Sequence, residues 1–125
     1  MLRCSAIIVT YNSGDAIEAC LRALASEGCE IVVVDNASRD DTVGRVRALA
    51  TQLPLKLLMM PANAGFAGGV NTGARNATGD AFLLLNPDAV AAPGSISALM
   101  NCLTRSGAGA AGGALCDDNG RYVCG

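Results

Sequence analysis

Residues 30–38 read Glu-Ile-Val-Val-Val-Asp-Asn-Ala-Ser, so four consecutive apolar side chains lead directly into polar ones. A short, continuous apolar run bounded by turn residues is typical of a parallel strand buried on both faces. Three further runs share this pattern: Cys4 to Thr10, Leu55 to Met60 and Ala81 to Asn86. The sequence therefore predicts four buried strands, each followed by a polar loop.

Segments with helical spacing separate these strands. Apolar side chains recur on one helical face within residues 16–24 and again within residues 43–50. Residues 68–77 fill the third interval, although their glycines weaken a prediction from helix propensity alone. A fourth helix is expected from about Ser95 to Thr104. This alternation predicts an α/β fold, with a parallel sheet, right-handed crossovers and helices on both faces.

Composition adds limits on domain number, partners and location. A length of 125 residues predicts a single domain over 1–125. The net charge is -2 and the nine Lys and Arg are scattered, which argues against nucleic acid as a partner. With no membrane-spanning apolar run and no export signal at its N-terminus, the chain is expected to be soluble and cytoplasmic.

The six cysteines are predicted to be reduced, buried thiols that pack as small apolar residues. The sequence contains no Cys-X-X-Cys pair and no histidine, so a zinc site is not expected. Cys116 and Cys124 are the one pair whose spacing could bridge a hairpin. The Asn119-Gly120 pair predicts such a hairpin within residues 113–124. Because the chain ends at Gly125, within the expected returning strand, we expect it to be a fragment.

Polar loops follow the first two strands. Asn12 could line a binding site or cap the next helix, and the loop is too bulky for the Gly-X-Gly-X-X-Gly turn of dinucleotide-binding proteins. Asp35 could accept a hydrogen bond from the imide N–H of uracil or thymine, or it could merely organise its turn. For Ser38, Asp40 and Asp41 we expect only turn and capping roles.

Two later loops also carry candidate ligand groups. Four glycines lie within residues 65–73, where they could let the backbone approach a ligand or let a helix pack closely. Asn86-Pro87-Asp88 follows the last strand and presents one amide and one carboxylate. That pair suits Mg²⁺ or Mn²⁺, although a plain turn is the alternative.

Four motifs thus occur in a set order and spacing: Ile8-Val9-Thr10-Tyr11-Asn12; Val33-Val34-Asp35-Asn36-Ala37-Ser38 with Asp41-Thr42; Asn63-Ala64-Gly65-Phe66-Ala67 through Asn71-Thr72-Gly73; and Leu84-Leu85-Asn86-Pro87-Asp88. Together they resemble the family 2 glycosyltransferases of the GT-A fold, in particular the rhamnosyltransferase-like branch. The resemblance covers nearly the whole chain. It implies a Rossmann-like, mostly parallel sheet, truncated before the acceptor-binding half.

The resemblance also implies roles for individual residues. The residues expected to contact the nucleotide are Thr10, Tyr11, Asn12, Asp35, Asn36, Asn63, Gly65, Asn71, Arg75 and Asn86. Asp88 would hold the Mg²⁺ or Mn²⁺ ion that bridges the diphosphate. Asn86 stands where the family carries the first Asp of its Asp-X-Asp motif, which puts tight metal binding in question.

The implied reaction is an inverting transfer of a hexose from a nucleoside-diphosphate sugar, dTDP-rhamnose or a UDP-hexose, to a hydroxyl of a glycan or lipid-linked glycan. Such chemistry belongs to cell-wall or polysaccharide biosynthesis, in the cytoplasm or at the inner face of the membrane. The general base lies downstream of the metal motif in the family, so it is expected to be absent from this chain.

Two other functions remain open from the sequence. The uncharged Asn86 would also suit a non-catalytic domain that binds nucleotide sugars or another protein. A nucleotidyltransferase is disfavoured, because the loop from Tyr11 to Gly14 has no Lys or Arg. Exposed apolar surface at the end of the chain could drive homodimer formation.

Overall fold

The computed structural model describes residues 2–123 and divides the chain into two compact units, Met1–Pro93 and Gly94–Gly125. The described part of the first unit contains four strands and three helices. In chain order they are β1 (Cys4–Thr10), α1 (Ile17–Ser26), β2 (Glu30–Asp35), α2 (Thr42–Ala50), β3 (Leu55–Met59), α3 (Gly65–Asn76) and β4 (Ala81–Leu84).

The strands form one sheet in the order β3-β2-β1-β4, and every pair of neighbours is parallel. The register aligns Thr10 at the end of β1 with Asp35 at the end of β2, and Asp35 with Met59 at the end of β3. The carboxyl ends of the strands therefore meet at one edge of the sheet, which we call the carboxyl edge. This arrangement confirms the predicted α/β fold with a parallel sheet.

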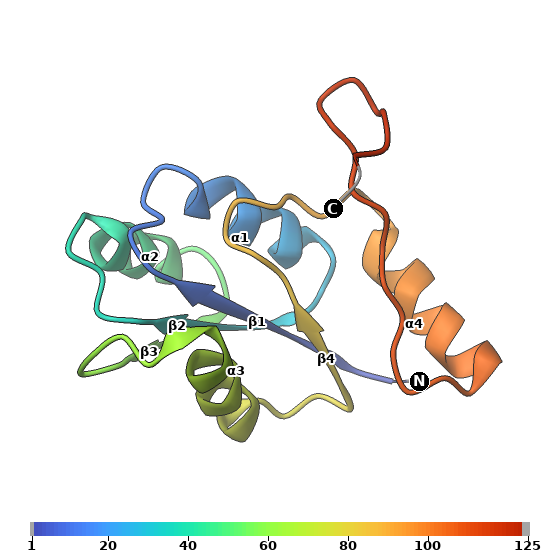
Figure 1. The fold of residues 1–125 in the computed structure, drawn as a ribbon, viewed down its shortest axis with the longest axis horizontal. Helices are drawn as coiled ribbons and strands as arrows, with labels where there is room; N and C mark the ends of the chain where they lie inside the picture. Colours follow the sequence, from blue (N-terminus) through green and yellow to red (C-terminus); the bar gives the residue numbers. More distant parts are fainter. Residues whose placement is uncertain (1, 124–125) are drawn as a thin grey trace. The chain divides into compact units, whose positions relative to one another are not determined.

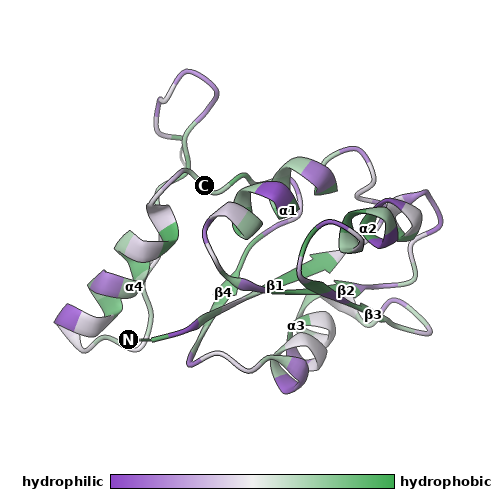
Figure 2. Ribbon diagram, turned by 180° about the vertical axis from the view of Figure 1, so that it is seen from behind, coloured by the Kyte–Doolittle hydropathy of each residue, from purple (hydrophilic) through white to green (hydrophobic). Residues whose placement is uncertain are grey.

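Helices cover both faces of the sheet, as expected: α1 and α2 lie on one face and α3 on the other (Figure 1). The core between these layers is aliphatic. Ile7 and Ile8 of β1 and the three valines of β2 are completely buried. Figure 2 shows apolar residues along the strands and polar residues interspersed in the helices and loops.

The outer strands differ from the prediction of full burial. Phe82 and Leu84 of β4 are 51% and 49% exposed, because β4 is an edge strand and its side chains alternate between covered and open sides. β4 also ends two residues earlier than predicted, before Asn86-Pro87. Proline has no N–H to donate and favours extended backbone before it, so the segment leaves the sheet.

The second unit contains helix α4 (Ser95–Ser106) and a turn near the end of the described chain. Cys116 and Tyr122 form an antiparallel bridge pair, and the Asp117 N–H donates to the Arg121 carbonyl oxygen at 2.8 Å. Within the described residues this is a turn closed by one bridge pair, and the predicted hairpin over 113–124 stays a prediction. The pairing of Cys116 with Cys124 lies outside the described residues. The domain boundary 1–125 stays a prediction.

The described cysteines are free, but Cys102 and Cys116 are exposed. These two correct the expectation that all thiols are buried: Cys102 lies on the open side of α4, and Cys116 lies in the bridge pair with Tyr122. In the described chain, no helix is both long and apolar enough to cross a membrane.

Candidate functional site

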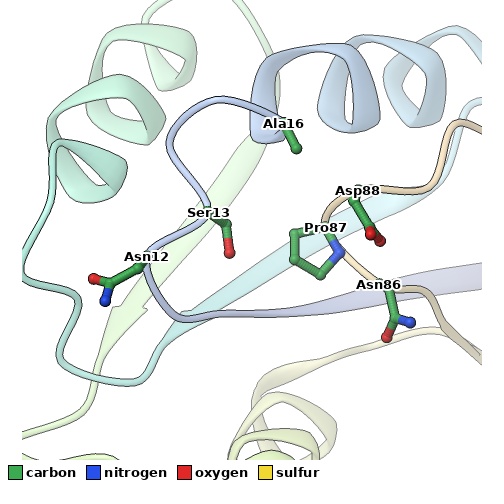
Figure 3. Close-up of a pocket in the computed structure, with 6 residues that line it drawn as sticks. All are labelled: Asn12, Ser13, Ala16, Asn86, Pro87 and Asp88. Carbon is green, nitrogen blue, oxygen red and sulfur yellow. The ribbon is translucent and has the colours of Figure 1, made fainter.

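A hollow of about 390 Å³ opens at the carboxyl edge between two loops. One loop joins β1 to α1 and the other follows β4 (Figure 3). The residues that line the hollow are Asn12, Ser13, Ala16, Asn86, Pro87 and Asp88. The structure therefore brings together the motifs that follow the first and fourth predicted strands.

The segment after β4 is held in a turn. The Ala89 N–H donates to the Asn86 carbonyl oxygen at 3.0 Å, and the Cys20 thiol of α1 approaches the same oxygen at 3.8 Å. Burial, and then the negative charge of Asp88, raises the pKa of Cys20 to about 11. Cys20 is thus a neutral thiol packed behind the hollow, and Asp88 is near enough to affect it.

Asp88 and Asn86 carry oxygen atoms of the kind that a hard divalent cation takes as ligands. Both side chains are exposed at the hollow, and within residues 2–123 no hydrogen bond or ion pair occupies the Asp88 carboxylate. Mg²⁺ and Mn²⁺ accept carboxylate and amide oxygens and complete their coordination with water and phosphate. No group of three His, Cys, Asp or Glu side chains able to hold a metal occurs in the described chain, so further ligands would have to come from solvent and substrate.

The loop after β1 lines the hollow, but contrary to expectation the side chain of Asn12 does not point into it. The Asn12 side chain points away from the segment 86–88 (Figure 3), and its Oδ1 accepts the Arg39 N–H at 2.8 Å. It therefore ties the loop to the β2–α2 loop, and neither Asn12 nor Ser13 caps α1 with its side chain. Asn12 has a left-handed backbone (φ 50°), which asparagine tolerates better than most residues. Tyr11, by contrast, is exposed.

Asp35 is buried at the end of β2 and is only 1% exposed. Its Oδ1 accepts the hydroxyls of Thr10 at 2.7 Å and Ser38 at 2.6 Å, and its Oδ2 accepts the Ser38 N–H at 2.9 Å. The geometry is that of a turn organiser, which the sequence had left open as the alternative. A pyrimidine ring could reach this carboxylate only if the loop around Ser38 moved. Thr10 is likewise buried and turned toward Asp35.

Asn36 joins the end of β2 to the start of α3. Its Nδ2 donates to the Gly65 carbonyl oxygen at 2.9 Å, and its Oδ1 accepts the Ala64 N–H at 3.3 Å. Asn63 accepts the Gly65 N–H at 2.9 Å, and Gly65 has a φ of 76°, which side-chain-bearing residues seldom adopt. These contacts let α3 begin at Gly65, three residues before the predicted start.

The remaining glycines of α3 serve close packing. A Cβ at Gly69 would lie 2.7 Å from a methyl group of Val9, and one at Gly73 would lie 2.6 Å from a methyl group of Ile7. Both glycines are buried against the sheet, so the packing explanation accounts for them. The sequence left open whether the glycines allow close approach to a ligand or close packing of a helix, and at these two positions close packing is the explanation.

Two predicted nucleotide contacts lie farther along α3. Asn71 is exposed in the middle of the helix, and Arg75 lies in its last turn. At 1.5 Å per residue, Arg75 is ~15 Å along the helix from Gly65. Next to Arg75, the Asn76 carbonyl oxygen accepts a hydrogen bond from Lys56 Nζ. Arg75 thus lies away from the carboxyl edge, because α3 runs away from that edge, and its contact with the nucleotide stays a prediction.

Sequence reasoning missed several residues of this region. Ser13 and Ala16 line the hollow, while Thr42 and Asp40 hold the loop that carries them. A hydroxyl or carboxylate just before a helix is usually interpreted as a cap, so the sequence carries no separate signal for a bond to another loop.

The sequence matches a known protein family and individual proteins. Residues 5–121 match the sequence model described as Glycosyl transferase family 2. The uncharacterized glycosyltransferase YfnE of Bacillus subtilis (strain 168) is 33% identical over 95 residues, which are 73% of this chain and 24% of that protein. The dolichol-phosphate mannosyltransferase of Pyrococcus furiosus is 30% identical over 106 residues, which are 82% of this chain and 30% of that protein.

Two solved structures are similar in fold and sequence. The mannosyltransferase PcManGT from Pyrobaculum calidifontis, in complex with GDP-Man and Mn²⁺, matches with a TM-score of 0.76 and 32% identity over 82% of this chain and 32% of that one. TarS 1-349 from Staphylococcus aureus, in complex with UDP-GlcNAc, matches with a TM-score of 0.73 and 27% identity, over 82% and 31% of the two chains. The chain thus spans about a third or less of each relative described here.

Proposed function

This chain belongs to glycosyltransferase family 2, and we propose that its Met1–Pro93 unit binds the nucleoside diphosphate of a sugar donor at the carboxyl edge of the sheet. The observation that carries this proposal is the hollow shared by the β1–α1 loop and the segment Asn86–Asp88. Parallel α/β sheets bind ligands in the crevice beyond the carboxyl ends of their strands.

The exposed carboxylate of Asp88, together with the amide oxygen of Asn86, would hold Mg²⁺ or Mn²⁺ against the diphosphate. When bound, such an ion neutralises negative charge on the phosphates and on the departing nucleoside diphosphate. The PcManGT complex with GDP-Man and Mn²⁺ supports the use of a divalent cation. Asn86 itself supplies an oxygen without charge, so most of the electrostatic attraction falls to Asp88.

The base and ribose would lie along the ends of β1 and β2. Tyr11 offers an exposed aromatic ring, and Asn36, Asn63 and Gly65 form the wall at the start of α3. Contact between a pyrimidine and Asp35 requires displacement of the Ser38 loop, as argued above. Asn71, which is exposed farther along α3, would be an outer contact.

The donor we propose is dTDP-rhamnose or a UDP-hexose. The bound GDP-Man and UDP-GlcNAc of the two solved relatives support a nucleoside-diphosphate hexose in general. The acceptor would be a hydroxyl of a glycan or lipid-linked glycan, in cell-wall or polysaccharide synthesis at the inner face of the membrane. Transfer would invert the anomeric carbon and needs a general base to take the hydroxyl proton. We propose that this base is supplied from outside the hollow.

A non-catalytic nucleotide-sugar-binding domain is the second candidate. It is favoured by one observation, the single carboxylate at the hollow. The two candidates differ in whether sugar transfer occurs when donor and acceptor are both present.

Self-association through the exposed side of β4, where Phe82 and Leu84 lie, belongs to the proposal as well and is measured by sedimentation velocity.

The test is calorimetric titration with dTDP, UDP, GDP and NAD, each with and without Mn²⁺. We expect selective binding of a pyrimidine diphosphate that depends on Mn²⁺ and weakens at least about tenfold in Asp88→Asn, equivalent to about 1.4 kcal/mol. Asp80→Asn is the matched control, because Asp80 lies just before β4, at the end opposite to Asp88. Its Oδ2 accepts the Arg3 N–H at 2.9 Å. Equal heats for all four ligands, or for both variants, would count against the proposal.

A further inference from the structure

The β1–α1 loop is held by side chains of the neighbouring β2–α2 loop. Three successive amides of the first loop each donate to a side chain of the second loop or of Thr42, the first residue of α2. The bonds are Asn12 N–H to Ser38 Oγ (2.9 Å), Ser13 N–H to Thr42 Oγ1 (2.8 Å) and Gly14 N–H to Asp40 Oδ2 (3.1 Å). The loop that lines the hollow therefore takes its position from residues 26–29 places along the chain.

The acceptors are fixed in turn. The Thr42 hydroxyl donates to Asp40 Oδ1 while it accepts the Ser13 N–H, so its one proton and one of its lone pairs are both used. The Thr42 N–H also donates to Asp40 Oδ1 at 3.0 Å. Thr42 is fully buried, so water does not compete for its hydroxyl.

Asp40 is exposed, but its carboxylate is fully engaged by the two loops. The hydrogen bond from the Thr42 hydroxyl, helped by the amides of Thr42 and Gly14, holds the pKa of Asp40 below its ordinary value. The acceptor of the Gly14 amide is therefore ionised at neutral pH, and a charged acceptor makes a stronger hydrogen bond.

We infer that Thr42 and Asp40 are positioning residues for nucleotide binding, which fix Ser13 in the wall of the hollow, and Gly14 next to it, without touching the ligand. The inference rests on the proposed function, since it assigns how that site is held. Neither residue lines the hollow. When a ligand must order a mobile loop, the lost conformational entropy lowers its affinity. These hydrogen bonds order the β1–α1 loop before the ligand binds.

The decisive pair of variants is Thr42→Val and Thr42→Ser. Valine has nearly the shape of threonine but removes both the acceptor for Ser13 and the donor to Asp40. Serine restores the hydroxyl. Each variant is titrated with UDP, dTDP and GDP in the presence of Mn²⁺, well below its melting temperature. Amide hydrogen exchange of Ser13 and Gly14 is followed in the same samples without ligand.

We expect Thr42→Val to lower the affinity for the nucleotide by about tenfold. Loss of a hydrogen bond that orients a ligand-binding group lowers affinity on this scale. Exchange at Ser13 and Gly14 should accelerate, and Thr42→Ser should restore both readouts. Thr78→Val is the control, because the Thr78 hydroxyl donates to Glu30 Oε2 at 2.8 Å at the opposite edge of the sheet. It should lower the melting temperature and leave the affinity unchanged.

Two outcomes would overturn the inference. If Thr42→Val binds as wild type does at temperatures where both are folded, the loop needs no positioning from Thr42, while the proposed function stands. If the Ser13 and Gly14 amides stay as protected as in wild type, the bonds do not order the loop. This second result decides the matter even if wild type binds none of the nucleotides, an outcome that would refute the proposed function separately.

Discussion

The substitution Gly73→Ala places a methyl group where α3 meets the sheet. The added Cβ would lie 2.6 Å from Ile7 Cγ2 and 3.2 Å from Val34 Cγ2. Carbon atoms pack best at about 3.5–4.0 Å, so the contact with Ile7 is ~1 Å too short. Ile7 is fully buried in the central strand, so it has little freedom to withdraw.

The magnitude follows from two opposing effects. Overpacking of a tight core costs about 1–3 kcal/mol, and an overlap of this size against a rigid strand belongs near the upper end. Alanine in a helix offsets this by about 1 kcal/mol relative to glycine. The free energy of unfolding should therefore fall by about 1–2 kcal/mol, which lowers the melting temperature by roughly 4–15 °C.

Urea unfolding followed by circular dichroism measures this change, since the chain has no Trp to report by fluorescence. Gly44→Ala in α2 is the control, because a Cβ there meets nothing within 4 Å. The same chemical change should then raise the unfolding free energy by about 0.5–1 kcal/mol. Gly73→Ala with the stability of wild type, or greater, would refute the packing explanation of the glycines in α3.

Three further predictions concern charge, reactivity and loop anchoring. The hydrogen bond from the Thr78 amide lowers the pKa of Glu30 from 4.5, so this carboxylate stabilises the fold above that pH. The stability difference between wild type and Glu30→Gln in urea titrations should shrink as pH falls through the folded pKa. Cys20, whose pKa is raised to about 11 mainly by burial, should resist iodoacetamide at mildly alkaline pH while exposed Cys102 reacts, as mass spectrometry would report. Asn36→Ala should lower the free energy of unfolding by about 1–3 kcal/mol, because the Gly65 carbonyl oxygen loses its hydrogen-bond donor. An unchanged melting temperature would contradict this prediction.

The central strands could be predicted to the residue because their signal is local. β1 and β2 are covered on both faces, so each is a continuous apolar run with polar ends. β4 has the same kind of sequence but lies at the edge of the sheet, and Phe82 is half exposed. Strand order depends on which strands pair, and a run of residues does not encode its own neighbours.

The candidate site could be predicted in part. Asn86 and Asp88 reach the carboxyl edge as the motif implied, because a residue just after a parallel strand can lie nowhere else. The bonds of Thr10 to Asp35 and of Arg39 to Asn12 could not be predicted, since they join segments that are 25 and 27 residues apart in the sequence. The distance of Arg75 from the carboxyl edge depends on where α3 begins, and the glycines at the start of this helix hide that start in the sequence.

Ala37 and Asn12 both have left-handed backbones, with φ of 61° and 50°, in the two loops joined across the carboxyl edge. An alanine held in this conformation costs about 1–2 kcal/mol, so these loops keep their shape only while their cross-links persist. Warming should loosen them before the sheet melts. The temperature at which nucleotide binding fails is therefore expected to fall below the melting temperature of the fold, and the heat tolerance of the site would be set by its loops.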